Sequence, residues 1–172
     1  KCLSAIVRDG RANLSKVGII GMAPIHAASQ YGRIACLIIL LDHGVDPNVR
    51  TADGNWTTPV IICCAMGHVK CLMLLLDRGA DPSLAGEGGL TPAHYSCIAG
   101  QLKCLQLLIA RRANFNAIAA DGQTPLDFAR VYGHPDCVEL LLEKNALGKN
   151  VDDLRLATEA MKVRLRVVSE RS

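Results

Sequence analysis

The sequence predicts an all-α solenoid built from stacked helix-turn-helix units, and three recurring features predict it. A proline recurs at intervals of 35, 33 and 33 residues, at Pro24, Pro59, Pro92 and Pro125. A glycine and a cysteine recur in step with it, at Gly32, Gly67, Gly100 and Gly133 and at Cys36, Cys71, Cys104 and Cys137. A Leu- and Ile-rich block follows each cysteine. A fixed period of 33 residues is typical of a repeat architecture.

Each recurring proline is expected to begin a first helix. Proline is favoured in the first helical turn because the amide it lacks has no partner inside the helix. A threonine that can cap the helix precedes three of the prolines, at Thr58, Thr91 and Thr124. A glycine eight residues after each proline ends the helix.

A second helix follows in each unit. The pattern Cys-Leu-x-x-Leu-Leu, as in residues 71–76, places one apolar stripe along it. Residues of the type Gly-Ala-Asp-Pro, at 79–82, then form a turn. One unit of about thirty residues cannot bury its apolar face alone, so the units stack on one another.

These motifs resemble the ankyrin repeat family, whose pattern combines Thr-Pro-x-His, Gly-His, Leu-Leu and Gly-Ala-Asp. The chain repeats them in phase, for example at 91–94, 67–68, 75–76 and 79–81. The resemblance implies β-hairpin loops between the units and binding of other macromolecules along a concave face. Three positions depart from the pattern: Ala23 replaces the capping threonine, and Ile61 and Asp127 replace the histidine.

The predicted array covers residues 1–147. It comprises a partial repeat at 1–19 and repeats at about 20–52, 53–86, 87–120 and 121–147. Because Lys1 enters in the middle of a repeat, we read the chain as part of a larger protein or complex whose neighbouring segments cover the first unit. Residues 148–172 break the period and form a C-terminal helical extension.

The extension is expected to be one amphipathic helix. Its apolar residues follow a 3,4 spacing, at Val151, Leu154, Thr158, Met161, Leu165 and Val168. Asn150 can cap its start, and four basic residues lie near its end, at Lys162, Arg164, Arg166 and Arg171. Two roles stay open, a cap on the last repeat or a helix that docks to a partner.

Composition excludes several classes of function. Nineteen Lys and Arg residues against 16 Asp and Glu leave a net charge of +3, too small for a nucleic-acid face, and six aromatic residues cannot supply base-stacking platforms. Apolar runs such as 34–41 are too short to span a membrane. Eight cysteines within apolar, helix-like segments indicate reduced thiols, so we expect an intracellular, cytoplasmic protein.

Neither a metal site nor an enzyme is expected. His68–Cys71, His94–Cys97 and His134–Cys137 have a spacing that could hold zinc, but the repeat pattern explains these residues without a metal. No nucleophile with a base, carboxylate pair or phosphate-binding loop is present, and a solenoid lacks a deep pocket. We expect no cofactor, metal or catalytic residue.

Candidate binding residues lie at two places in the repeat. Just before each turn glycine, where polar residues are usual in the family, the chain offers an apolar line at Tyr31, Met66, Ile98 and Tyr132. The alternative is that these side chains pack on their own hairpins. The other candidates belong to the hairpins: Trp56, in a hairpin enlarged by two residues, with Asn55, Arg50 and Glu87. Trp56 either anchors a partner or folds back on its hairpin.

The sequence thus predicts a non-catalytic interaction module that binds a protein partner through its hairpin tips and concave face. A scaffold or adaptor in a cytoskeletal or ciliary assembly fits a weak likeness to small animal proteins of the same family. The alternative is a substrate-recognition or regulatory segment of a larger enzyme, such as a ubiquitin ligase. The sequence contains no box motif for such a ligase.

Overall fold

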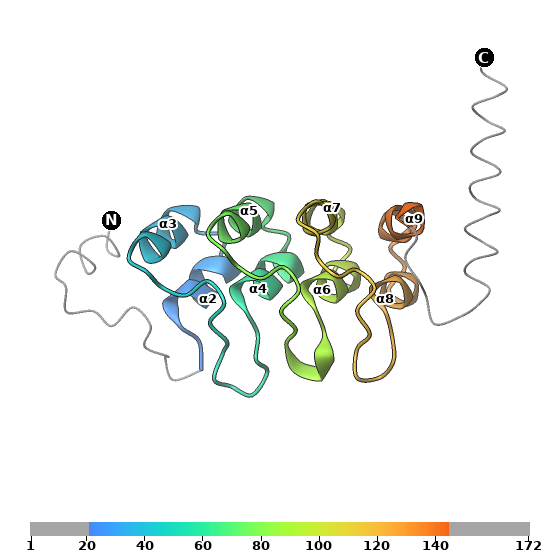
Figure 1. Cartoon of the computed structure of the whole chain (residues 1–172), viewed down its shortest axis with the longest axis horizontal. Helices are drawn as coiled ribbons and strands as arrows, with labels where there is room; N and C mark the ends of the chain where they lie inside the picture. The colour runs from blue at the N-terminus through green and yellow to red at the C-terminus, as the bar shows by residue number, and fades with distance from the viewer. Residues whose placement is uncertain (1–20, 145–172) are drawn as a thin grey trace, which may run out of the picture.

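Four helix pairs form the described part of the chain, residues 21–144 of the computed structural model. The helices are α2 (Pro24–Gln30), α3 (Ile34–Asp42), α4 (Pro59–Met66), α5 (Val69–Asp77), α6 (Pro92–Ile98), α7 (Leu102–Ala110), α8 (Pro125–Val131) and α9 (Pro135–Glu143). The first helices of the pairs form one layer, the second helices form another, and long loops extend beyond the first layer (Figure 1). The predicted helical solenoid is therefore confirmed.

Every first helix begins at the recurring proline and ends one or two residues before the recurring glycine. The Thr58 hydroxyl accepts the Ile61 amide at 3.2 Å, and the Thr124 hydroxyl accepts the Asp127 amide at 3.3 Å. Thr91 differs, because its hydroxyl lies 2.9 Å from Nδ1 of His94 instead of accepting a backbone amide. Gly67 ends α4 in the left-handed region, with φ at +73°.

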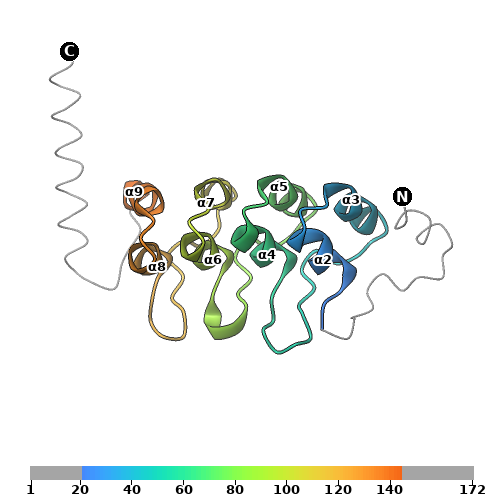
Figure 2. The ribbon, with the colours of Figure 1, turned by 180° about the vertical axis from the view of Figure 1, so that it is seen from behind.

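The loops between the pairs are closed like hairpins, although no strand forms within residues 21–144. Backbone bonds close them, from the amide of Thr51 to the carbonyl of Thr57, for example, at 3.0 Å. Neighbouring loops are also joined, from Glu87 to Asn55 at 3.0 Å and from Ala120 to Gly88 at 2.8 Å. The row of loops follows the row of first helices along one side of the array (Figure 2).

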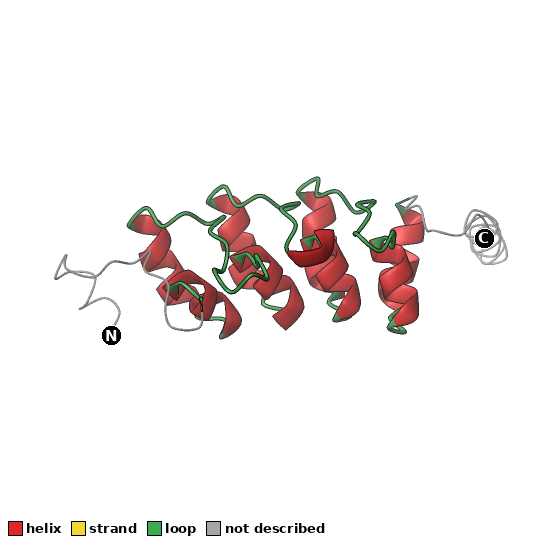
Figure 3. Cartoon of the chain, turned by 90° about the horizontal axis from the view of Figure 1, so that it is seen from below, coloured by secondary structure: helices red, strands yellow, loops and turns green. Residues whose placement is uncertain are grey.

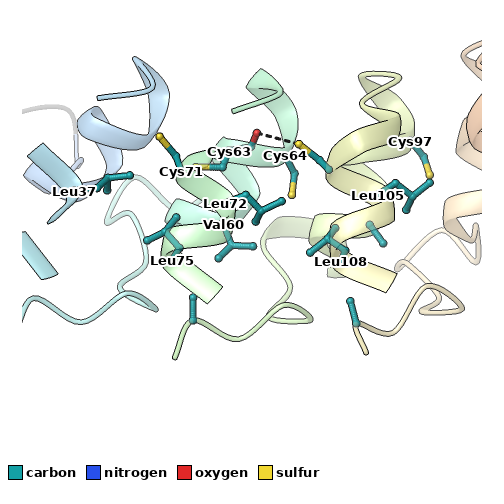
Figure 4. Packing of buried hydrophobic residues seen from close by; sticks show 14 of the residues in the cluster. Leu37, Val60, Cys63, Cys64, Cys71, Leu72, Leu75, Cys97, Leu105 and Leu108 are labelled. Atoms are coloured by element: carbon teal, nitrogen blue, oxygen red, sulfur yellow. Dashed lines mark hydrogen bonds between the residues drawn. The ribbon is translucent and has the colours of Figure 1, made fainter. Parts of the chain in front are cut away.

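The core lies between the two helical layers. Leu37, Leu72 and Leu105 occupy the same position in α3, α5 and α7 and are fully buried there. Cysteines pack among these leucines as small apolar residues do (Figure 4). Apolar contact between neighbouring pairs therefore holds the array together.

Ion pairs join successive second helices at their C-terminal ends. Arg78 contacts Asp42 at 2.7 Å, and Arg111 contacts Asp77 at 2.8 Å. These side chains are more than one third exposed, so each pair adds at most about 1 kcal/mol. Seen from below, the helix pairs follow one another along the array, and the helix axes lie across its length (Figure 3).

Three residues before the turn glycine, the last helix pair has a charged residue, whereas the residue at this position is buried in the other three pairs. Ser29, Cys64 and Cys97 occupy one position and are buried. Arg130 takes this position in α8 and is partly exposed. The α8–α9 pair therefore has a charged residue at a position that is buried in the other three pairs.

Some expectations from the sequence lie outside the described residues. They are the partial repeat at 1–19 and the helix at 148–172. The division of the chain into repeats at the residues given above stays a prediction.

Candidate functional site

Four large apolar side chains are exposed where the first helices end. Tyr31 is 66% exposed, Met66 51%, Val131 72% and Tyr132 52%. Met66 and Val131 are the last residues of α4 and α8, and Tyr31 and Tyr132 follow α2 and α8 directly. The first helices pack against one another in order, so their ends follow one another along the array. We call these four residues, with Ile98, the apolar line.

Ile98 differs from the sequence-based expectation of an exposed side chain, because it is half-buried. Counted back from the turn glycine, Tyr31, Met66 and Tyr132 share one position, where the third repeat has Ala99. Ile98 lies one residue earlier and is the counterpart of Val131. Strict alignment on the glycines would have found Val131, which the sequence analysis missed.

The line is held in register by hydrogen bonds between repeats. Nε2 of His68 donates to the carbonyl of Gln30 at 3.1 Å, and Nε2 of His134 donates to the carbonyl of Ile98 at 3.1 Å. Each acceptor lies in the last turn of the preceding first helix. The ends of neighbouring first helices, which carry the line, are therefore fixed relative to each other.

The turn glycines allow the His68 and His134 rings to lie close to the backbone of the preceding repeat. A Cβ on Gly32 would lie 2.9 Å from the His68 ring, and one on Gly100 would lie 2.5 Å from the His134 ring. Gln101 fills the corresponding place in the third repeat, with its side-chain oxygen 2.4 Å from where a Cβ on Gly67 would be. Glycine is needed at these positions for space as well as for its positive φ.

The C-terminal end of the line is aromatic. Tyr132 stacks on Phe128 with ring centroids 6.2 Å apart, and Phe128 meets the edge of His94 at 5.6 Å. Phe128 is half-buried and His94 is fully buried. Tyr132 is thus the exposed end of an aromatic row that begins in the core.

Two buried histidines, His26 and His94, join each helix start to the loop that follows the helix pair. Nδ1 of His26 accepts the Ala23 amide at 3.0 Å, so Nε2 carries the proton and donates to the Val49 carbonyl at 3.0 Å. His94 links Thr91 to the Gln123 carbonyl in the same way. Burial lowers the pKa of both imidazoles, which keeps them neutral.

The departures from the histidine pattern are accommodated locally. Asp127 replaces the histidine in α8, and its Oδ2 accepts both the amide and the hydroxyl of Thr124 at 2.8 Å. Ile61 is buried in α4, and its Cδ1 would lie 3.2 Å from a Cβ on Gly86. The missing histidine is therefore replaced by apolar packing against the next loop.

The enlarged hairpin presents Trp56 at the surface. Trp56 is 57% exposed and has a positive φ of 52°. The guanidinium carbon of Arg50 lies 5.1 Å from the centre of its ring, which is cation–π geometry. One face of the indole thus contacts its own hairpin, while more than half of the side chain stays exposed.

Hydrogen bonds order the tip that holds Trp56. Asp53 accepts the Thr51 hydroxyl at 2.6 Å and the Asn55 amide at 3.0 Å, and these bonds lower the pKa of Asp53. The carbonyl of Asn55 also accepts the amide of Glu87 from the next loop. Arg50 and Asn55 therefore help to hold this tip in place.

Each hairpin tip exposes an acidic side chain, Asp53, Glu87 or Asp121, and the first two loops also expose Asp46 and Asp81 nearer the second helices. Tyr95, which is half-buried in α6, has its pKa raised by burial and by the charge of Glu87. This coupling places the Glu87 carboxylate within electrostatic range of the first-helix layer.

The cysteines form no metal site within residues 21–144. No group of three or more His, Cys, Asp and Glu side chains there is arranged to hold a metal ion. The histidines of the three zinc-like pairs bond instead to backbone atoms, as described above. All seven described cysteines carry free thiols.

Two pairs of thiols interact with each other in the core. A hydrogen bond to Cys71, and then burial, raise the pKa of Cys63. Burial, and then a hydrogen bond to Cys104, raise the pKa of Cys64. Cys104 also donates to the carbonyl of Cys63 at 3.9 Å (Figure 4). These contacts cross between helices, so spacing along the chain could not reveal them.

The array, the helix-to-loop histidines and the turn glycines together define a class, a repeat protein of the ankyrin type. The family model for ankyrin repeats (3 copies) matches residues 2–86 and 84–153. The chain belongs to the ankyrin repeat family, whose domains are generally non-catalytic modules for protein–protein interaction.

Two further findings complete the comparison. No curated protein matches the chain. Within the described residues, no helix has the length and apolar character needed to cross a membrane.

Proposed function

We infer that the protein is a scaffold or adaptor that binds a protein partner across the apolar line. One observation carries this inference: three of the four first helices, α2, α4 and α8, end in exposed Tyr, Met or Val side chains, in a repeat family that binds proteins. Large apolar side chains exposed at successive helix ends are typical of an interaction site. Tyrosine is also enriched among the residues that contribute most to binding.

The two residues that precede each turn glycine are uncharged in all four described pairs. At the two positions before each turn glycine stand Gln30, Tyr31, Ala65, Met66, Ile98, Ala99, Val131 and Tyr132. A partner would therefore bury no unpaired charge of this chain there. The flanking hydrogen bonds of His68 and His134 keep this surface rigid, which lowers the entropy lost on binding.

Trp56 and the hairpin tips support the same function as a second contact region. The exposed indole, held by Arg50, presents a large flat surface with few rotamers to lose. We place Trp56, Asn55, Arg50 and Glu87 at the edge of the partner site. The apolar line forms its centre.

Affinity capture with the full chain as bait tests this proposal. Proteins captured by the unsubstituted chain are compared with those captured by Met66→Glu. Met73→Glu is the matched control, because Met73 is 45% exposed on α5 in the other helical layer. A partner lost with Met66→Glu and kept with Met73→Glu supports the proposal. Partners unchanged by both substitutions would contradict it.

A further inference from the structure

The loops that join the described helix pairs carry more acidic than basic residues at their tips. Residues 49–58, 84–91 and 117–124 hold three carboxylates, Asp53, Glu87 and Asp121, and one basic residue, Arg50. The loops of Asp53 and Glu87 are joined, since the Glu87 amide donates to the Asn55 carbonyl at 3.0 Å. Complementary charge therefore favours a basic group of a partner at this edge of the array.

The carboxylates of Asp53 and Glu87 form no ion pair within the described residues. The donors to Asp53 are neutral groups, the Thr51 hydroxyl at 2.6 Å and the amide and side chain of Asn55 at 3.0 and 3.1 Å. These bonds lower the pKa of Asp53, which is therefore charged at neutral pH. Glu87 is exposed, and no residue in the described part of the chain donates a hydrogen bond to its side chain. The Glu87 carboxylate is thus the one that is open to a donor from a partner.

The exposed indole of Trp56 lies at the same tip. A Cβ on Gly86, the residue before Glu87, would lie 3.5 Å from the Trp56 carbonyl oxygen, so the two loops touch here. The guanidinium carbon of Arg50 is 5.1 Å from the centre of the indole, so this ring already interacts with one guanidinium. Trp56 is 57% exposed with Arg50 in place, which leaves indole surface for a second group.

We propose that the tip of Trp56 and Glu87 binds an arginine side chain of the protein partner. The guanidinium stacks on the exposed indole and donates to the Glu87 carboxylate, while the charge of Asp53 offsets the repulsion from Arg50. Arginine suits this tip better than lysine, because its planar group stacks on aromatic rings and binds a carboxylate through two hydrogen bonds. The proposal rests on the proposed function, since it names what the partner presents at the edge of the same site.

Two other kinds of occupant fit the tip less well. An acidic side chain would find a donor in Arg50, but this one positive charge stands against the two carboxylates of Asp53 and Glu87. An apolar side chain would cover the indole and take water away from both carboxylates without supplying a charge to pair with them, which is costly. A guanidinium satisfies the ring and the carboxylate together.

Trp56 itself reports on binding, because it is the only tryptophan in the 172 residues. Its indole N–H therefore gives one resonance in a heteronuclear NMR spectrum of the full chain. The probe is the peptide acetyl-Gly-Arg-Gly-amide, and its matched control contains citrulline, whose neutral urea has the shape of the guanidinium. We expect the arginine peptide to shift the indole resonance to saturation and to bind at least about threefold more tightly than the citrulline peptide.

Three results of this titration would overturn the proposal. One is an indole resonance that the arginine peptide does not move. Another is equal affinity for the arginine and citrulline peptides, which would show that the charge has no part in binding. The third is equal affinity for the corresponding lysine peptide, which would show that a point charge suffices and that the planar group is not recognised.

Glu87→Gln tests the carboxylate and keeps the backbone amide that bonds to Asn55. Asp81→Asn is the matched control, because it removes the same charge from an exposed residue of the same loop, nearer α5. We expect Glu87→Gln to weaken binding of the arginine peptide at least about threefold and Asp81→Asn to have a smaller effect, because salt screens distant charges. Equal effects of the two substitutions, or no effect of Glu87→Gln, would contradict the site.

The outcome is independent of the test of the apolar line. If the arginine peptide leaves the indole unchanged but Met66→Glu still loses its partner, this proposal fails and the proposed function stands. If the arginine peptide binds at Trp56 and Met66→Glu keeps every partner, the apolar line is excluded as the centre of the site and the tip remains as a binding site for arginine.

Discussion

Tyr132 lies against Phe128 with the two rings 23° from parallel, and Phe128 in turn meets His94 edge-on. Phe128 lies within α8 and Tyr132 directly follows this helix, and the two aromatic residues have different roles. Phe128 is half-buried and packs against the core, whereas more than half of the Tyr132 side chain is exposed.

Substitution of each aromatic residue should separate these roles. Phe128→Ala removes a half-buried ring and its contact with His94, so we expect it to lower the free energy of unfolding by about 2 kcal/mol. Tyr132→Ala should cost less than about 1 kcal/mol. Urea unfolding followed by circular dichroism measures both. Equal losses would show that Tyr132 is also a packing residue.

Glycine substitutions should measure how tightly neighbouring repeats are joined. Gly79→Ala places a Cβ at φ +86° in open space, so its cost of about 1 kcal/mol reflects backbone strain alone. Gly100→Ala adds a clash with the His134 ring, 2.5 Å from the new Cβ. We expect it to cost at least 1 kcal/mol more in urea unfolding. A difference near zero would mean that His134 moves aside freely.

The stability of the fold should fall as the pH falls from about 7 to about 5. The pKa values of His26 and His94 are lowered in the folded chain, so the unfolded chain binds more protons as the pH drops below the ordinary value of 6.5. Asp53 does not contribute in this range, because its pKa is lowered from 3.8. Urea midpoints measured at several pH values give the slope.

His94→Gln is the variant that checks the source of that slope. It removes one titrating imidazole, so the dependence on pH between 7 and 5 should become weaker even if the variant is less stable overall. A slope identical to that of the unsubstituted chain would exclude His94 as a contributor.

All eight cysteines should be titratable as free thiols after denaturation, with no stoichiometric zinc. In the native chain, burial raises the pKa of Cys63, Cys64, Cys97 and Cys137, with the Cys71 hydrogen bond as the larger cause at Cys63. Cys36 is only half-buried, so among the described cysteines it should react first with a thiol reagent. One zinc ion per chain, or missing thiols, would contradict this account.

Much of the fold could be predicted because the boundaries of the first helices have local chemical causes. Proline, a capping threonine and a glycine lie at fixed offsets, and the structure places the helix ends there. The thiol contacts of Cys63 with Cys71 and of Cys64 with Cys104 depend on packing between helices. Such contacts leave no mark in the spacing of residues.

The candidate site was predicted less completely than the fold. Tyr31, Met66 and Tyr132 were found from their position next to the turn glycine, and the structure exposes all three. Ile98 lies one residue before the position that these three share and is half-buried, whereas its counterpart Val131 is exposed. The contact between Arg50 and Trp56 depends on the path of an enlarged loop, which no repeat pattern specifies.

The central claim is that the apolar line binds a partner and does not serve packing. The most direct test measures the dissociation constant of a partner identified by capture, for Met66→Glu and for Met73→Glu, together with the melting temperature of each variant. We predict at least tenfold weaker binding for Met66→Glu, unchanged binding for Met73→Glu, and melting temperatures within about 2 °C of the unsubstituted chain. Unchanged binding by Met66→Glu, or a large fall in its melting temperature, would contradict the claim and move the partner site to Trp56 and the hairpin tips.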